Sequence, residues 1–318
     1  ALFAERRPLD VLVHDMGSRL QTKGVNCTFR ANAYPDGSFV DLGEGIAMSG
    51  PELMFVELAR VMEPAVHLLL GMELCGRFSR DAANPRNADV VYGLRPVTTV
   101  ERLRAFAEEA HWIRGSGRAL ETIDRIVENA WSPMEALMAA LIVLPSDELG
   151  YDLWPITLNP RKELGEGLSH LGSAESRVPD IMFTGTDIGI NYDGEDHFKL
   201  RDIARAAVEA DRHPEDPKRS LELEDAIAEA RRRIVADKRR DRDLMAMGLT
   251  VYSATKEDLE EQGGLDRMMG LCIAAIEDSG ARNLANTRRM LKNRSRAAAR
   301  QEFIWSLMPG PRSVAARK

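Results

Sequence analysis

Cysteine, aromatic residues and long apolar runs are scarce in this sequence. Only three cysteines occur among 318 residues, far apart at positions 27, 75 and 272, so neither a disulfide framework nor a cysteine-rich zinc site is expected, and a reducing compartment, the cytoplasm, is favoured. No apolar stretch approaches the roughly 20 residues of a membrane-spanning helix, and no export signal is readable, so no membrane partner is expected. Phosphate-binding loops and nucleophile elbows are not evident either, which disfavours nucleotide hydrolysis and serine hydrolase chemistry.

The composition is that of a folded protein whose charge is unevenly distributed. Hydrophobic residues make up 44% and charged residues 29% of the chain, and the length suits two domains or one elaborated domain. The net charge is −7, yet residues 281–318 contain 10 lysines and arginines against one acid, so this segment carries +9 and the remainder −16. This basic segment predicts phosphate contacts at Arg288, Arg289, Lys292, Arg294, Arg296 and Arg300. The alternatives are a solvated basic helix, or a helix that docks on a protein partner through Leu284, Leu291, Ile304 and Trp305.

Local patterns divide the chain into three segments. An N-terminal region, residues 1–130, begins with short strands between glycine turns and continues with helical periodicity from Pro51. Residues 131–280 then follow the order helix, strands, helix, strand, and residues 281–318 form a basic helical tail. The predicted strands lie near 11–13, 25–30, 39–42, 46–48 and 249–254, and the predicted helices near 51–63, 65–78, 100–111, 119–129 and 133–144.

A hairpin in the middle segment gathers polar side chains. Two strand-like runs flank residues 184–187, which predicts a tight turn with Gly185 at the first central position of a type II′ turn. A turn centred between residues 185 and 186 pairs positions whose numbers sum to 371, so Asp180 lies opposite Asn191. Alternation along the strand adds Asp193 to the same face. The other face of the hairpin carries the side chains of Ile188, Ile190 and Tyr192.

Oxygen ligands on one face of a hairpin suit a divalent cation. Mg²⁺ or Mn²⁺ prefers carboxylate and amide oxygens and keeps open positions for water and a phosphate oxygen. We therefore expect Asp180 and Asp193 to be metal ligands and phosphodiester hydrolysis to be the reaction. His197 follows four residues beyond Asp193, where it could bind the metal, contact phosphate or act as a general acid or base. A hydrogen-bonded structural histidine is the alternative.

These residues resemble the core of the PD-(D/E)xK restriction-endonuclease-like superfamily. Most similar is the branch related to very-short-patch-repair endonucleases, found also as the C-terminal domain of abortive-infection type IV antitoxin-like proteins. The similarity is carried by Pro179-Asp180, by Asn191-Tyr192-Asp193-Gly194 at the end of the next strand, and by His197. A later helix with Asp237, Arg239 and Arg240, followed by Gly248 and the last strand, matches the same pattern. The resemblance covers residues 131–279, and Met48-Ser49-Gly50-Pro51-Glu52 resembles the middle region of those antitoxin-like proteins.

The resemblance implies a fold and a function. The fold is α/β, or α+β overall, with a restriction-endonuclease-like αβββαβ core. The function is metal-dependent cleavage of DNA, with Arg239 and Arg240 among the nucleic-acid contacts. Many members take a further metal-binding glutamate from the first core helix, and this position maps to Glu135. The alternative for Glu135 is structural, because Ser132 and Glu135 have the spacing of a helix capping box.

One position departs from the family pattern and leaves two functions open. Asn191 stands where the family usually has a metal-binding glutamate, and a neutral amide is a weaker ligand for Mg²⁺ than a carboxylate. The first function is an active nuclease that uses Mg²⁺ or Mn²⁺. The second is a DNA-binding, antitoxin-like protein or transcriptional regulator that has kept the fold and lost catalysis. The catalytic residues of the active form would be Asp180, Asp193, His197, Glu135 and Asn191.

The long charged helix after residue 216 also predicts a polar site. Asp216 and Pro217 suit its N-cap and first turn, and Gly248 suits the residue after its end. Asp237 and Asp241 fall on the same stripe as its apolar residues and are therefore expected to be buried. Arg233 or Arg240 is the expected ion-pair partner, with a role in orienting the site as the alternative. The apolar residues of the stripe are Leu223, Ile227, Ala230, Ile234 and Leu244.

Overall fold

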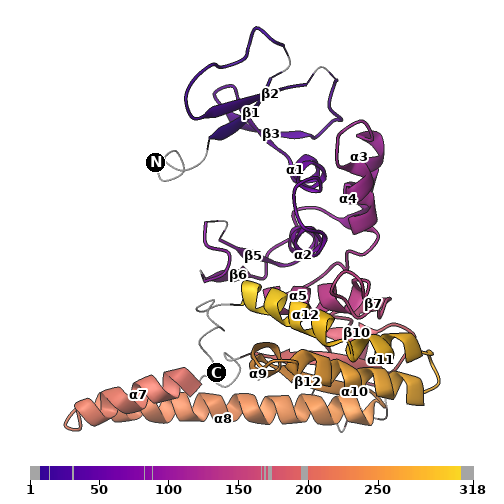
Figure 1. Ribbon diagram of the computed structural model, residues 1–318. Coiled ribbons are helices and arrows are strands. Elements are labelled where there is room, and N and C mark those ends of the chain that lie inside the picture. Colours follow the sequence, from indigo (N-terminus) through magenta and orange to yellow (C-terminus); the bar gives the residue numbers. More distant parts are fainter. Residues whose placement is uncertain are drawn as a thin grey trace.

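The chain is a mixed α/β protein with small sheets and many helices (Figure 1). The computed structural model describes residues 8–308, except residues 14, 31, 82, 88, 166, 168, 169, 171–173 and 195–199. No helix of the described chain combines the length and the apolar character needed to cross a membrane. Cys27, Cys75 and Cys272 are free thiols.

The N-terminal region contains two separate pairs of strands. Strands β1 (Leu9–Val13) and β2 (Val25–Phe29) pair in parallel, whereas β3 (Phe39–Gly43) and β4 (Ile46–Ser49) form an antiparallel hairpin. These four strands lie where the sequence predicts strands. Local periodicity predicts that a segment is extended but not its partner, so the parallel pairing of β1 with β2 comes only from the structure.

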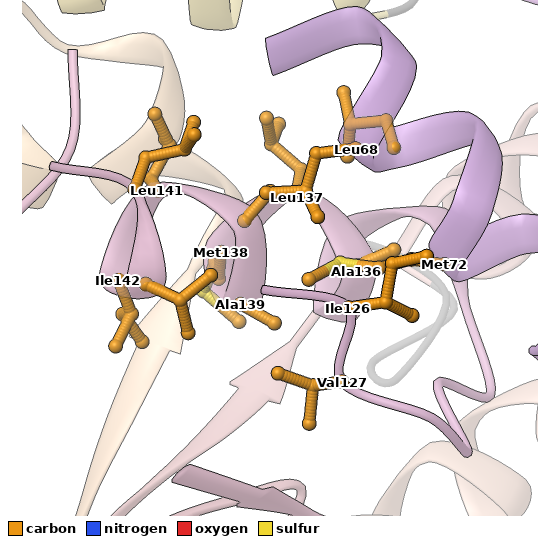
Figure 2. Close-up of a cluster of buried hydrophobic side chains, with 14 of the residues drawn as sticks. Leu68, Met72, Ile126, Val127, Ala136, Leu137, Met138, Ala139, Leu141 and Ile142 are labelled. Atoms are coloured by element: carbon orange, nitrogen blue, oxygen red, sulfur yellow. The ribbon is translucent and has the colours of Figure 1, made fainter. Parts of the chain in front are cut away.

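Five helices and a short hairpin follow. The helices are α1 (Pro51–Leu58), α2 (Pro64–Leu74), α3 (Val100–Glu109), α4 (Ser116–Ile123) and α5 (Pro133–Val143), and the hairpin consists of β5 (Phe78–Arg80) and β6 (Val90–Tyr92). The sequence predicts each of these five segments as a helix, and most of the helices end several residues earlier than predicted. Figure 2 shows Leu68 and Met72 of α2 packing with Leu137 and Ala136 of α5 in the core. Their burial, rather than helix propensity, stabilises these short helices.

A four-stranded mixed sheet forms the centre of the C-terminal half. Its strand order is β12 (Thr250–Thr255), β11 (Ile188–Asp193), β10 (Ile181–Phe183), β7 (Ile156–Leu158). Strand β10 is antiparallel to both neighbours, and β11 is parallel to β12. The two-stranded pair β8 (Lys162–Glu163) and β9 (Ser176–Arg177) is inserted between β7 and β10. The predicted order of helix, strands, helix, strand is therefore confirmed.

The long helical stretch forms two antiparallel helices that extend beyond the rest of the molecule in Figure 1. Helix α7 (Leu200–Arg212) packs on the first half of α8 (Pro217–Ala246). Asp216 caps α8 by accepting from the Lys218 N–H at 3.0 Å, and Gly248 follows the helix with a φ of +77°, as predicted. The predicted buried stripe is only partly correct. Ile227 and Ile234 are 49% and 43% exposed, whereas Ala230 and Leu244 are buried, because only parts of α8 lie against α7 and the sheet.

The sheet is apolar on one face and polar in part on the other. Ile181 and Ile190 pair across β10 and β11 and belong to the main core. On the opposite face Met182 packs with Leu244 of α8 and with Leu249. Helix α8 therefore covers the face of the sheet that carries the even-numbered residues of β10 and the odd-numbered residues of β11.

Residues 281–308 of the basic C-terminal segment are part of the folded body. Helices α9 (Lys256–Glu260), α10 (Gly264–Asp278), α11 (Ala285–Leu291) and α12 (Arg294–Leu307) follow β12. Leu284 and Ile304 are 8% and 1% exposed and belong to the main core, so the prediction that they face a protein partner is wrong. The apolar side of this segment is already covered by its own chain.

Two of its predicted phosphate ligands are also used internally. Arg300 is 3% exposed, lies over the ring of Tyr151, bonds the Leu149 carbonyl at 2.7 Å and pairs with Asp266. Arg296 donates to the Ser146 carbonyl. The prediction of phosphate contact is therefore wrong for the buried Arg300, and Arg296 is tied to the loop after α5.

Candidate functional site

The predicted register of the β10–β11 hairpin is correct, although its turn is of another type. Ile181 pairs with Ile190, and Met182 with Gly189, so the position numbers sum to 371. The Thr186 N–H donates to the Phe183 carbonyl at 3.1 Å, which places Gly185, with a φ of +80°, at the second central position of the turn. The type II′ prediction is thus wrong. The register survives because the four-residue loop is centred on the same bond.

Asp180 and Asn191 link the two strands at the open end of this hairpin, away from its turn. The Tyr192 N–H donates to Asp180 Oδ2 at 2.6 Å, and the Asp180 N–H donates to Asn191 Oδ1 at 3.1 Å. The Asn191 side chain is 1% exposed. Its side-chain carbonyl oxygen therefore accepts a hydrogen bond from the backbone N–H of Asp180 without carrying a charge. A glutamate at this position would bury a charged carboxylate.

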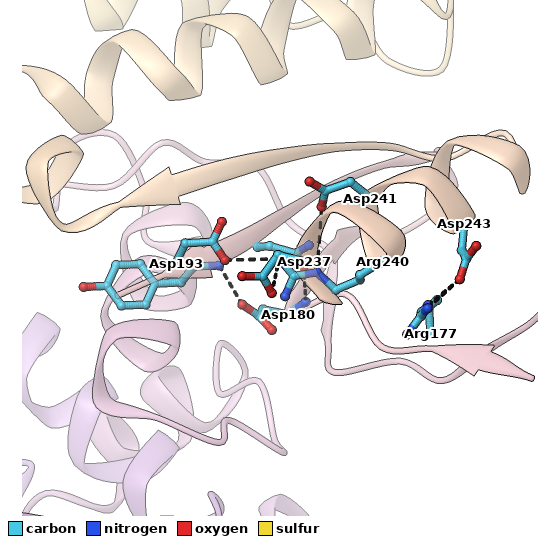
Figure 3. Close-up of polar contacts among 9 residues, drawn as sticks. Arg177, Asp180, Asp193, Asp237, Arg240, Asp241 and Asp243 are labelled. Carbon is cyan, nitrogen blue, oxygen red and sulfur yellow. Dashed lines mark hydrogen bonds and ion pairs between the residues drawn. The ribbon is translucent and has the colours of Figure 1, made fainter. Parts of the chain in front are cut away.

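Asp193 lies on the same face and is paired with Arg240 of α8. Arg240 Nη2 is 3.1 Å from Asp193 Oδ1, and the two side chains are 18% and 12% exposed. The guanidinium also lies 4.0 Å from Asp237 and 3.8 Å from Asp241, as Figure 3 shows. The predicted ion pair between Asp237 and Arg240 is therefore confirmed. One guanidinium stands among the carboxylates that α8 and β11 bring together.

Glu135 enters the site from the first turn of α5. Its Oε2 accepts from the Trp131 N–H at 2.9 Å and from Asn159 Nδ2 at 2.8 Å, while its own N–H donates to Ser132 Oγ at 3.2 Å. The capping interpretation therefore holds for Ser132, whereas the carboxylate reaches one residue further back than a capping box requires. Asn159, which follows β7, was not predicted. The only sequence signal for it was its place at the end of a candidate strand.

The capping bond gives a stability prediction. Replacing Ser132 with alanine removes the side-chain acceptor of the Glu135 N–H at the start of α5, and we expect a loss of about 1 kcal/mol in the free energy of unfolding. Urea denaturation of the wild type and of Ser132→Ala measures this difference in the free energy of unfolding. Ser295→Ala, an exposed serine near the start of α12, where Asn293 is the N-cap, should change stability by less than about 0.5 kcal/mol. Equal effects of the two changes would contradict the role of Ser132.

Burial and like charge perturb the two inner carboxyl groups. Burial, and after it the nearby Glu135 carboxylate, raise the pKa of Asp180 to about 7, against the Tyr192 hydrogen bond and the charge of Arg240. Burial also raises the pKa of Glu135, against its hydrogen bonds from Asn159, Trp131 and Ser132. Buried carboxyl groups with raised pKa values beside a specific cation are typical of a functional site.

The remaining predicted residues lie elsewhere. Arg239 is exposed on the outward side of α8, next to the inward-facing Arg240. On α11 and just after it, Arg288 pairs with Glu277 at 2.9 Å, Arg289 bonds Asn286 at 2.8 Å, and Lys292 is exposed. His197 lies outside the described residues.

The described residues do not fit a bound Mg²⁺ or Mn²⁺. Asp193 is paired with Arg240, and the Oδ atoms of Asp180 and Asn191 named above accept backbone hydrogen bonds. A guanidinium among these carboxylates would repel a second cation. In the part of the chain that the structure describes, no three His, Cys, Asp or Glu side chains are placed to hold a metal ion.

Comparisons with known proteins leave the site to be interpreted from its own geometry. No family model, no curated protein and no solved structure matches the chain.

Proposed function

We propose that this protein binds nucleic acid through a restriction-endonuclease-like core whose carboxylate site is neutralised by Arg240 instead of a metal ion. The observation that carries the proposal is the Arg240–Asp193 pair at 3.1 Å, inside a site assembled from α5, β10, β11 and α8. The element order α5, β7, β10, β11, α8, β12 supports the core that the sequence resemblance implies.

The placement of the acids supports the same proposal. Glu135 comes from the first helix of this order, Asp180 from the residue before β10 and Asp193 from the end of β11. These are the positions at which the resemblance predicts the catalytic acids. A site of this kind that holds its own cation keeps the fold and the DNA-facing surface, and it gives up the metal-dependent step.

Binding and cleavage are tested together. The protein is incubated with supercoiled, linear duplex and single-stranded DNA in Mg²⁺ or Mn²⁺, beside Asp180→Ala prepared in the same way, and binding is followed by fluorescence anisotropy. We expect DNA binding in the micromolar range, weakened by salt and similar for both proteins, without cleavage.

Two other outcomes contradict this proposal in different ways. Metal-dependent cleavage by the wild type that is lost in Asp180→Ala would establish the nuclease and would require Arg240 to leave Asp193. Absence of binding to any of the three DNA forms at low salt would remove nucleic acid as the partner.

A further inference from the structure

We propose that the outward face of α8 from Arg231 onward, called below its second half, contacts the phosphate backbone of duplex DNA. The inference rests on the nucleic-acid binding proposed above and adds the surface and the form of the ligand. Four exposed cations define this surface, called here the α8 basic face: Arg231, Lys238, Arg239 and Arg242.

The four cations lie on one side of the helix. Positions i, i+7, i+8 and i+11 of an α-helix fall within about 80° to 100° of one another, so these side chains point the same way. They extend over about 16 Å at a rise of about 1.5 Å per residue. None of them makes an ion pair with another of the described residues, so the described part of the chain leaves their charge without a paired acid.

The acids of the same half of α8 point inward. Asp237 and Asp241 lie beside Arg240. Asp243 Oδ2 accepts a hydrogen bond from Arg177 Nε of β9 at 2.9 Å. The inward acids contact Arg240 and Arg177, whereas the outward side carries the four exposed cations together with the exposed Val235. This separation of charge favours a polyanion as the partner.

The part of α8 before Arg231 carries acids as well as cations. Its exposed acids are Glu224 and Asp225, and it is packed against α7. A nucleic acid that follows the helix would be attracted more strongly by the cations from Arg231 onward than by this part of mixed charge. The contact should thus be confined to the end of α8 that adjoins the sheet and the carboxylate site.

The chemistry of the face favours a duplex over a single strand. Proteins that hold single strands stack bases on aromatic side chains, and α8 contains no Phe, Tyr or Trp. A long helix with a free cationic side suits the major groove of B-form DNA, which is about 12 Å wide, whereas the major groove of duplex RNA is too narrow to admit side chains. The proposed contacts are with phosphates, which carry no sequence information, so contact with little sequence preference is expected.

The test compares two full-length variants with the same change in charge. In one, the four cations of the α8 basic face are replaced by alanine. In the control, four exposed cations outside α8 and outside the basic C-terminal segment are replaced: Arg19→Ala, Lys23→Ala, Arg95→Ala and Arg114→Ala. All eight positions are on the surface, so both variants should fold, which circular dichroism checks.

The readout is the salt dependence of binding to a 20-base-pair duplex of arbitrary sequence. Each lost phosphate contact lowers the slope of log K against log salt by about 0.9, so the α8 variant should lose about 3.6 of the wild-type slope and the control much less. Single-stranded DNA and duplex RNA should compete more weakly than duplex DNA.

Each contrary outcome has its own meaning. An equal loss of slope in both variants, or a larger loss in the control, would overturn the α8 assignment while DNA binding stands. Stronger competition by single-stranded DNA or by duplex RNA would overturn duplex DNA as the ligand. If the wild type binds no nucleic acid, both this inference and the proposed function fail.

Discussion

Replacing Asp180 with asparagine should stabilise the protein at and above pH 7 and remove the part of the pH dependence of unfolding that this carboxyl contributes. The pKa of Asp180 is about 7 in the folded protein, because the carboxyl is buried and lies near Glu135, whereas an unfolded chain would hold it near 3.9. The folded state therefore binds this proton more tightly. Wild-type stability should fall as the pH rises from about 4 to about 7, by up to about 4 kcal/mol.

The asparagine variant keeps the geometry and loses the ionisation. Its Oδ1 can still accept from the Tyr192 N–H, so the hairpin contact is retained. Urea denaturation of both proteins from pH 4 to pH 9 measures the difference. Asp187→Asn, an exposed residue in the loop of the same hairpin, is the control and should follow the wild type. A wild type whose stability rises steadily over this pH range would contradict the assignment.

Replacing Arg240 with methionine should destabilise the protein by about 2 to 3 kcal/mol, somewhat less than the loss typical of a fully buried ion pair. Methionine fills similar space and leaves Asp193, which is 12% exposed, without its 3.1 Å partner. It also removes the charge that lowers the pKa of Asp180, so that pKa should rise further. Denaturation at pH 8 gives the loss of stability, and carboxyl NMR gives the titration.

Two further variants separate the ion pair from a general effect of substitution. Arg239→Met changes the exposed neighbour on the same helix and should alter stability by less than about 0.5 kcal/mol. Asp193→Asn combined with Arg240→Met should recover at least about 1 kcal/mol relative to Arg240→Met alone, because no unpaired carboxylate remains at position 193. Simple additivity of the two changes would argue against the pair.

Much of the middle of the fold could be predicted from local sequence. The start of α5 at Ser132, the break before Pro217 and the end of α8 before Gly248 depend on caps and on proline and glycine conformation, which act within a few residues. The pairing of Asp180 with Asn191 followed from the length of one short loop. Period-2 alternation then placed Asp193 on the same face.

The sequence alone therefore determined that carboxylate and amide oxygens would gather on one face of the β10–β11 hairpin. Only the tertiary structure decided what meets them. Arg240 and Asp193 are 47 positions apart, Glu135 and Asn159 are 24 apart, and Arg300 reaches the residues after α5 from 150 positions away. Such contacts depend on how helices pack against the sheet, which no local period or spacing encodes. The same packing buried the apolar side of the C-terminal segment and left the cations of α8 facing outward.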